Sequence, residues 1–262
     1  MIGATTYYFF PLRHNVAIQN IKFAFPGLSN SESKTILKKT SMHFGMVLVD
    51  FLRQSYLNKD TINKLVRIDE KSSKILDKLD GGIIMTGHMG NWEMFLPALG
   101  LNGYPFVVVT QTQKNISSQR FFNKIRSFPN ISLIPKNGSR KKMLVALEQN
   151  KFLGLASDQN AGARGIKIPF FSIPASIPKG AALFHIKTSM PIIVGFCILS
   201  RDLKYDLCFR QIDLSTIPKN KEDAIIAINS QFSQKLEDQI IKHPHQYFWF
   251  HRKWEKSIYK KT

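Results

Sequence analysis

The chain has 262 residues, of which 44% are hydrophobic, so it is long and apolar enough to bury a large core. Its two cysteines, Cys197 and Cys208, lie far apart without a CxxC or Cys/His cluster, which excludes a disulfide framework and a structural zinc site and favours a reducing compartment. Lysine and arginine outnumber aspartate and glutamate by 37 to 18, and the formal charge of +19 indicates an anionic partner such as nucleic acid, a phospholipid surface or an acidic carrier.

The first residues, MIGATTYYFFPLRHN, contain an apolar run that is shorter than the roughly 20 residues needed to span a membrane. No basic region precedes the run and no cleavage site follows it, so it makes a poor secretory signal. We expect residues 1–28 to be either the end of a longer membrane helix or a helix lying on a membrane interface. Residues 29–262 are expected to form one domain, because no repeat, low-complexity segment or linker divides them.

Farther along the chain, the hydrophobic period changes repeatedly between helix and strand. Residues 30–57 have helical spacing and predict one or two helices, with Ser29 or Ser31 as the N-cap. Strands are then expected at 81–87, 105–111, 131–135, 152–157, 166–171, 191–200 and 203–212, the last two as a hairpin, and helical or amphipathic segments at 91–101, 115–126, 139–150, 180–188 and 221–243. This alternation predicts a single-domain α/β fold with an open, mostly parallel sheet flanked by helices.

Ligands bind such sheets beyond the carboxyl ends of the strands, and two side chains stand out there. His88 follows the strand GIIMT and Asp158 follows FLGLAS, so parallel strands would place an imidazole and a carboxylate on the same rim. Gly87 and Gly90 flank His88 and permit tight turns and close approach of a substrate.

The residues after His88 predict how its ring is oriented. Asn91 is expected to cap the next helix, which would place Glu93 in the first helical turn. From that turn Glu93 would accept the Nδ1 proton of His88 and leave Nε2 as a base.

Each of these residues also has an ordinary structural explanation. A histidine followed five positions later by a glutamate arises by chance in many proteins, and Asp158 alone could cap a turn. Trp92 and Phe95 are interpreted first as core anchors. The tail HPHQYFWFHRKWEKSIYKK interleaves aromatic residues with positive charge, so it is either an interfacial anchor or a final segment whose Trp249 and Trp254 pack on the core.

Four blocks of sequence, in this order, carry a family resemblance: NIKFAFPGLS at 20–29, GHMGNWE at 87–93, SDQNAGARGIKIPFFSIPASIPKGAALFHIKTSMPIIVGF at 157–196 and HPHQYFWFHRKWE at 243–255. Together they resemble the bacterial lipid A late acyltransferases, the lauroyl and myristoyl transferases, within the glycerolipid and lysophospholipid acyltransferase superfamily. The His-x4-acid pattern of HMGNWE is the shared superfamily motif. The order of all four blocks is more specific than the motif alone.

The resemblance implies a role for several residues of this chain. His88 matches the general base that deprotonates the acceptor hydroxyl, and Glu93 matches its orienting carboxylate. Arg126 in RFFNKIRSF matches an arginine that steadies the thioester oxyanion or the donor, with Arg120 as the fallback. Asp158 matches an acid that shapes the site or orients the substrate. The further positions expected to contact substrate are Gly87, Asn91, Gln159, Arg120 and Arg140.

Two features depart from the patterns of the superfamily. Chains of the lipid A family typically begin with a membrane-spanning helix, whereas here TTYYFFPL at 5–12 matches only its end. The glycerol-3-phosphate branch has an asparagine before the catalytic histidine and a Pro-Glu-Gly-Thr block. Gly87 and the residues DQNAG at 158–162 stand in those places, which favours the lipid A branch.

The implied reaction moves a fatty acyl chain from a carrier thioester, either acyl-acyl carrier protein or acyl-CoA, to a hydroxyl of an anionic lipid A precursor. Such a transfer needs a base, an oxyanion stabiliser and exclusion of water, and no metal or organic cofactor is expected. No GxSxG elbow is present, so direct attack without an acyl-enzyme is the simpler mechanism. The expected location is the cytoplasmic face of the bacterial inner membrane, where the enzyme is either peripheral or anchored by its N-terminal segment.

Two alternatives remain open from the sequence. A lysophospholipid or other glycolipid acyltransferase of the same fold would carry the same motif. A non-enzymatic protein that binds anionic lipid or nucleic acid would explain the charge, but no nucleic-acid-binding motif is present and nucleic acid is not an expected partner.

Overall fold

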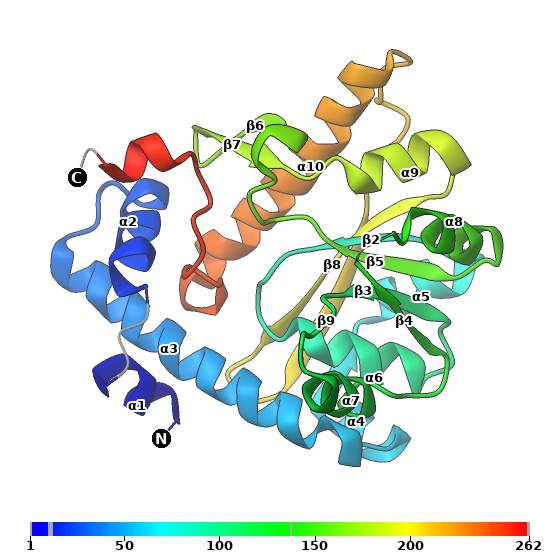
Figure 1. Ribbon diagram of the computed structural model, residues 1–262, viewed down its shortest axis with the longest axis horizontal. Helices are drawn as coiled ribbons and strands as arrows, with labels where there is room; N and C mark the ends of the chain where they lie inside the picture. The colour runs from blue at the N-terminus through cyan, green and yellow to red at the C-terminus, as the bar shows by residue number, and fades with distance from the viewer. Residues whose placement is uncertain (1, 10–12, 137, 261–262) are drawn as a thin grey trace.

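The computed structural model describes residues 2–9, 13–136 and 138–260 (Figure 1). In these residues seven strands form one sheet, and neighbouring strands run parallel except for one antiparallel pair. Their order across the sheet is β1 (Val66–Ile68), β9 (Tyr205–Gln211), β8 (Ile192–Leu199), β2 (Gly82–Thr86), β5 (Phe152–Ala156), β3 (Phe106–Thr110) and β4 (Ile131–Pro135). The predicted single-domain α/β fold with a mostly parallel sheet is confirmed.

Helices cover both faces of this sheet. They are α1 (Ile2–Phe9), α2 (His14–Ala24), α3 (Asn30–Arg53), α4 (Lys59–Leu65), α5 (Glu70–Lys78), α6 (Phe95–Gly100), α7 (Ile116–Ile125), α8 (Arg140–Glu148), α9 (Gly180–Thr188) and α10 (Lys221–Lys242). Short 3-10 turns lie at η1 (Gln54–Tyr56), η2 (Trp92–Met94), η3 (Gly162–Arg164), η4 (Pro244–Gln246) and η5 (Lys256–Lys260).

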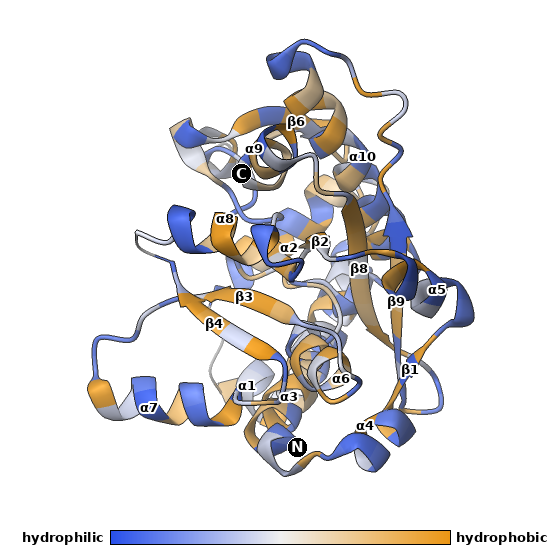
Figure 2. Cartoon of the chain, turned by 90° about the vertical axis from the view of Figure 1, so that its right-hand side faces the viewer, coloured by the Kyte–Doolittle hydropathy of each residue, from blue (hydrophilic) through white to orange (hydrophobic). Residues whose placement is uncertain are grey.

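The side chains of the central strand β2 explain why both faces of the sheet are covered by helices. Ile83 and Met85 belong to the core under α8, α9 and α10, while Ile84 belongs to a second core under α4, α5 and α6. Because side chains alternate along a strand, a strand covered on both faces must be apolar at every position. Figure 2 shows the same hydrophobic character along β3 and β8.

The first three helices pack together at one end of the molecule (Figure 1). Helix α3 begins with a capping box in which Ser29 and Glu32 bond each other's backbone N–H groups, so Ser29 rather than Ser31 is the N-cap. Helix α1 crosses α3 so closely that a Cβ on Gly45 would lie 2.4 Å from the backbone nitrogen of Gly3. Of the apolar segment 5–12, residues 10–12 lie outside the described part of the chain, and the division at residue 28 stays a prediction.

The segment 166–171 forms a strand, but not in the main sheet. Strand β6 (Ile166–Phe170) pairs antiparallel with β7 (Ile173–Ile177), which was not predicted. The turn between them holds Phe171 and Ser172 at φ 48° and 61°. Such left-handed turns usually contain asparagine or glycine, so the sequence lacked the common hairpin signal. By contrast, the hairpin predicted for 191–212 is confirmed as β8 and β9, with Cys197 and Cys208 as free thiols on neighbouring strands.

The tail after α10 is a largely irregular segment that packs against α3 and the loop after β2. Trp249 and Trp254 are each 1% exposed and belong to the core, as the core interpretation of these two residues predicts, while an interfacial role for the rest of the tail stays a prediction. Tyr247 forms an isolated bridge with Met89, and the Phe248 N–H donates to the His88 carbonyl over 2.9 Å. The tail therefore supports the loop that carries His88.

Candidate active site

A cleft of about 540 Å³ opens at the carboxyl ends of β2, β3 and β5. Thr86, Gly87 and His88 line it from the end of β2, and Gln159 lines it from the loop after β5. Phe122 of α7 closes the opposite side. This position agrees with the general rule for ligand sites in open parallel sheets.

His88 and Asp158 meet at this rim, as the parallel strands predicted. Strands β2 and β5 are direct neighbours with Thr86 opposite Ala156, so the two chains leave the sheet side by side. The Asp158 carboxylate binds His88 twice: Oδ1 lies 2.8 Å from ring Nδ1, and Oδ2 accepts the backbone N–H over 3.0 Å. The His88 side chain is 21% exposed and that of Asp158 is fully buried, so only the imidazole of the pair reaches the cleft.

The prediction that Glu93 binds the Nδ1 proton of His88 is wrong, because Asp158 occupies that position. Glu93 instead accepts two hydrogen bonds from Arg126, from Nη2 over 2.6 Å and from Nε over 2.9 Å. The cause is local. Glu93 lies in the 3-10 turn η2 rather than in the first turn of an α-helix, and its carboxylate points toward the end of α7.

Asn91 does not cap this turn with its side chain, contrary to prediction. Its side chain is fully buried and donates to Asp50 of α3 over 3.3 Å, while its backbone N–H donates to the Cys197 carbonyl over 2.8 Å. Asn91 therefore anchors the loop from behind and does not face the cleft.

Gly90 is required by the geometry of the loop. Its φ is +63°, and an added Cβ would lie 1.9 Å from the carbonyl oxygen of Cys197. The Gly90 N–H donates to Gln246 over 2.8 Å, and its carbonyl lies 3.2 Å from the buried His43 ring. Strand β8, helix α3 and the tail thus hold the His88 loop at once, so the imidazole is fixed before any ligand arrives.

Of the two predicted arginines, Arg126 is the one that lines the cleft. It follows the last residue of α7, and its guanidinium lies 5.0 Å from the ring centre of Phe51 and 5.6 Å from that of Phe122. The fallback Arg120 lies on the exposed face of the same helix. The bidentate pair with Glu93 and the two rings restrict Arg126 to one orientation.

The other predicted substrate positions are spread more widely. Gly87 lines the cleft, and the Gln159 amide nitrogen lies 3.5 Å from His88 Nε2. Arg140 is exposed at the first turn of α8 and is not placed beside His88 by any of these contacts. Asn137, in the same basic run, lies outside the described residues.

The proton affinity of His88 reflects opposing influences. Burial, which has the largest effect, lowers the pKa of His88, but attraction to Asp158, the hydrogen bond that His88 donates to Asp158 and the charge of Glu93 together raise the pKa above its ordinary value. Burial likewise favours protonated Asp158, yet the neighbouring His88, His251 and Lys253 hold the pKa of Asp158 well below its usual range. The pair therefore keeps an ionised carboxylate behind an imidazole that can accept a proton.

Lys253 was missed as a site residue, although its block HRKWE was recognised. Its side chain is fully buried, and its Nζ donates to the backbone carbonyl of Asp158. A lysine among basic residues of a tail is normally solvated. Only the neighbouring tryptophans indicated that this part of the tail enters the core.

A histidine and carboxylate pair in a cleft at the carboxyl edge of an open α/β sheet is an arrangement that enzymes use for general acid and base chemistry. Comparisons with known proteins identify the family. Residues 1–256 match the model of the bacterial lipid A biosynthesis acyltransferase family, so the chain belongs to that family and is an acyltransferase.

Named relatives agree with this assignment at low identity. A lipid A biosynthesis acyltransferase of Shigella flexneri is 21% identical over 97% of this chain and 82% of its own length, and one of Haemophilus influenzae is 21% identical over 95% and 80%. A phosphatidylinositol mannoside acyltransferase of Mycolicibacterium smegmatis is 22% identical over 68% of this chain and 58% of its own length.

Proposed function

We propose that this enzyme transfers a fatty acyl chain from a carrier thioester to a hydroxyl of a lipid A precursor, with His88 as the general base. The observation that carries the proposal is the pair formed by His88 and Asp158 at the mouth of the cleft. Because Asp158 holds Nδ1, the Nε2 atom of the ring is left for the acceptor.

The reaction proceeds by direct attack. His88 Nε2 takes the proton of the acceptor hydroxyl as its oxygen bonds to the thioester carbonyl carbon, and Asp158 stabilises the imidazolium that forms. The tetrahedral adduct then collapses, the carbon–sulfur bond breaks, and the imidazolium returns its proton to the leaving thiolate. No acyl-enzyme is needed.

Arg126 stabilises the oxyanion of this adduct. Among the contacts of the described residues, Glu93 accepts from Nε and Nη2 of Arg126, which leaves Nη1 to face a ligand in the cleft. Glu93 is therefore proposed to act through Arg126 rather than on His88. A fixed guanidinium beside the reacting carbonyl provides the preorganised positive charge that acyl transfer requires.

The acyl chain is assigned to the apolar depth of the same cleft. Phe95, Leu96, Phe106 and Val108 line this part, beyond the polar groups at its mouth. Phe106 packs so closely on Gly154 that an added Cβ there would lie 2.4 Å from its ring. The ring of Phe106 therefore fills the space over Gly154 in the lining of the cleft.

A lipid surface is the proposed location of the enzyme. The described residues contain no helix with the length and hydropathy of a membrane span. An apolar face is exposed on α3 and the β8–β9 turn, at Met42, Met46, Leu48, Val49, Leu52 and Leu203. Two pockets, of about 660 and 460 Å³, open on this region next to α1.

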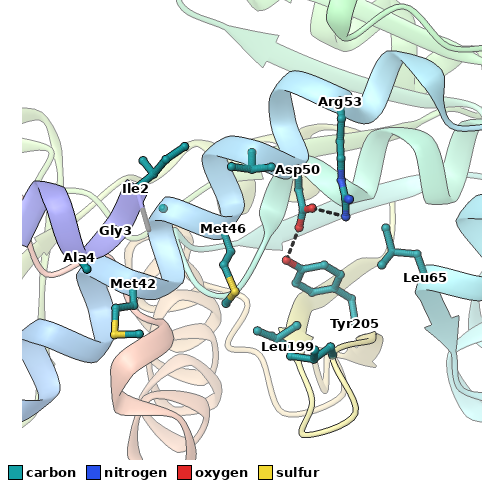
Figure 3. Close-up of a pocket in the computed structure, with 13 residues that line it drawn as sticks. Ile2, Gly3, Ala4, Met42, Met46, Asp50, Arg53, Leu65, Leu199 and Tyr205 are labelled. Carbon is teal, nitrogen blue, oxygen red and sulfur yellow. Dashed lines mark hydrogen bonds and ion pairs between the residues drawn. The ribbon is translucent and has the colours of Figure 1, made fainter.

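Figure 3 shows Met46 and Leu199 pointing into the larger pocket, where Asp50 is joined to Tyr205 and Arg53. An aromatic path connects this side of α3 to the catalytic histidine: the Phe44 and Trp92 ring centres lie 5.7 Å apart, and those of Trp92 and His88 lie 4.8 Å apart. We infer that a lipid acceptor held in a membrane under α3 approaches His88 along this row of rings. The formal charge of +19 favours an anionic lipid surface, such as the cytoplasmic face of a bacterial inner membrane, and an acidic carrier protein as donor.

A second candidate acceptor is another glycolipid. The relative named as a phosphatidylinositol mannoside acyltransferase favours this alternative, because that name specifies a sugar-bearing phospholipid. The same base and cleft would serve either acceptor.

Mass spectrometry distinguishes these functions. Purified enzyme is incubated with lipid A precursors or with phospholipids and phospholipid glycosides, and each mixture receives either acyl-acyl carrier protein or acyl-CoA. The expected result is a mass increase of one acyl group on the lipid A precursor only. A gain confined to the other lipids would support the second candidate, and vesicle binding without any transfer would contradict the proposed reaction.

A further inference from the structure

Lys253 is a buried cation directly behind the catalytic pair. It lies in the tail between Arg252 and Trp254 and is 1% exposed, whereas Arg252 is exposed. Its Nζ donates to the backbone carbonyl of Asp158 and lies 4.2 Å from the ring centre of Phe170. The lysine therefore contacts the residue whose carboxylate binds His88, on the side away from the cleft.

Burial of the Lys253 ammonium group is unfavourable by itself. Burial lowers the pKa of Lys253 to about 8, while Asp158 and Glu237 of α10 oppose this change. The ammonium form still predominates at neutral pH, although burial opposes it. A methionine would fill the same space without this opposition, so the charge itself calls for an explanation in the site.

That explanation lies in the balance of charges around His88. The carboxylates of Asp158 and Glu93 favour the protonated imidazole, and Arg126 is bound to Glu93. The positive charge of Lys253 opposes them and lowers the pKa of His88. His251, whose ring centre lies 6.4 Å from that of His88, has its pKa lowered to about 4 by burial and is neutral at neutral pH. The buried hydroxyl of Tyr247 also faces Asp158, and burial raises its pKa, so it too is neutral.

We propose that Lys253 is a positioning residue for the acyl transfer proposed above, in which its ammonium group fixes Asp158 and keeps His88 available as a neutral base near neutral pH. Without this cation, two carboxylates would hold the imidazole in its protonated form over a wider pH range. The inference rests on the proposed function only for its consequence in catalysis, because the charge balance is a property of the free enzyme.

Four variants separate charge, hydrogen bonding and size. Lys253→Arg keeps the charge, Lys253→Gln keeps a donor without the charge, and Lys253→Met keeps neither. Arg252→Met is the matched control, because it removes a cation from the adjacent exposed position. The titration of His88 is followed by NMR with isotope-labelled histidine, with the His88→Gln spectrum used to assign the signal.

The expected result is that His88 titrates at higher pH in Lys253→Gln and Lys253→Met, by on the order of one unit, because a neighbouring positive charge is lost. Lys253→Arg and Arg252→Met are expected to titrate like the wild type. In the same two neutral variants, the acidic limb of the pH profile of kcat/KM should move to higher pH. An unchanged His88 titration in folded Lys253→Met would overturn the proposal, even if its activity fell.

A native-state measurement covers the case in which both neutral variants fail to fold. The side-chain carbon signal of labelled Lys253 reports its charge in the wild-type protein, and a neutral amine at neutral pH would contradict the inference. If His88 shifts as expected but no acyl acceptor is ever modified, the proposed function fails and the role of Lys253 in tuning His88 stands.

Discussion

At the scale of single residues, the site depends on the carboxylate of Asp158, which makes two hydrogen bonds to His88. Asp158 fixes both the backbone and the ring of His88, and it is fully buried, so it cannot meet a substrate itself. Its contribution must therefore pass through the imidazole. Glu93 stands in the same relation to Arg126, so the site consists of two partly buried groups that line the cleft, each held by a carboxylate.

We expect His88→Ala to abolish acyl transfer and Asp158→Asn to lower kcat by on the order of 10⁴-fold, by analogy with loss of the carboxylate in a histidine triad. An amide at position 158 would favour the wrong tautomer of the ring. Initial rates and thermal unfolding are measured together, with His243→Ala at the end of α10 as a control. Near wild-type rates in folded His88→Ala would show that another group is the base.

Arg126→Ala is expected to lower turnover by roughly 10²- to 10³-fold, as removal of one oxyanion donor does elsewhere. Arg126→Lys should not restore it, because an ammonium cannot form the bidentate pair with Glu93. In a double-mutant cycle, Glu93→Gln should add little to the loss already caused by Arg126→Ala, since Glu93 acts through Arg126. Additive losses would assign Glu93 a separate task.

The pH dependence follows from the direction of the His88 pKa. A base must be neutral, and the pKa of His88 is raised above 6.5, so kcat/KM should fall as pH drops through a value above 6.5. Removing the negative charge in Asp158→Asn should move this acidic limb to lower pH. A wild-type limb below 6.5, or a limb that moves upward in Asp158→Asn, would contradict the assignment.

At the scale of elements, the loop between β2 and α6 is fixed by segments distant in sequence. Gly90 allows this because its left-handed backbone passes within van der Waals contact of β8. Gly90→Ala is therefore expected to cost about 1 kcal/mol or more of unfolding free energy and to reduce activity. Chemical denaturation of this variant is compared with that of Gly27→Ala, where an added Cβ meets nothing within 4 Å. Equal stability of the two variants would argue against the close approach.

The same loop shows how far sequence reasoning reaches. The strand β2, the position of His88 at its end and the neighbouring position of Asp158 follow from local hydrophobic patterns and the topology rule for parallel sheets. The partner of Nδ1 does not, because it depends on whether residues 91–93 begin an α-helix or a 3-10 turn. That choice is made by contacts with Asp50, Cys197 and Gln246, which local patterns do not contain.

Strand β1 and the hairpin strand β7 could not be predicted from the sequence, for related reasons. Strand β1 has three residues, too few to show a period, and it pairs with β9 from the far end of the chain. Strand β7 contains Pro174 and follows a turn without glycine or asparagine. The burial of Lys253 could not be predicted either, because a charged residue is expected at the surface unless a partner is known.

At the scale of the whole molecule, the apolar face on α3 and the excess of positive charge predict how the enzyme meets a membrane. Met46 and Val49 are 42% and 40% exposed and line the pocket shown in Figure 3. Replacing both with aspartate would place charges in the hydrocarbon region and against anionic headgroups. We expect this double variant to lose most of its affinity for anionic vesicles in sedimentation assays.

A control variant separates the effect of the α3 face on vesicle binding from the effect of net charge. The variant Lys71→Asp/Lys74→Asp makes a larger change in net charge on the exposed surface of α5, away from α3, and should bind vesicles nearly as well as the wild type at moderate salt. Transfer to a detergent-solubilised acceptor should survive in the α3 variant, because its substitutions lie outside the catalytic cleft. If vesicle binding followed net charge in both variants alike, α3 would not be the membrane face, and the acceptor would have to reach His88 from another side of the cleft.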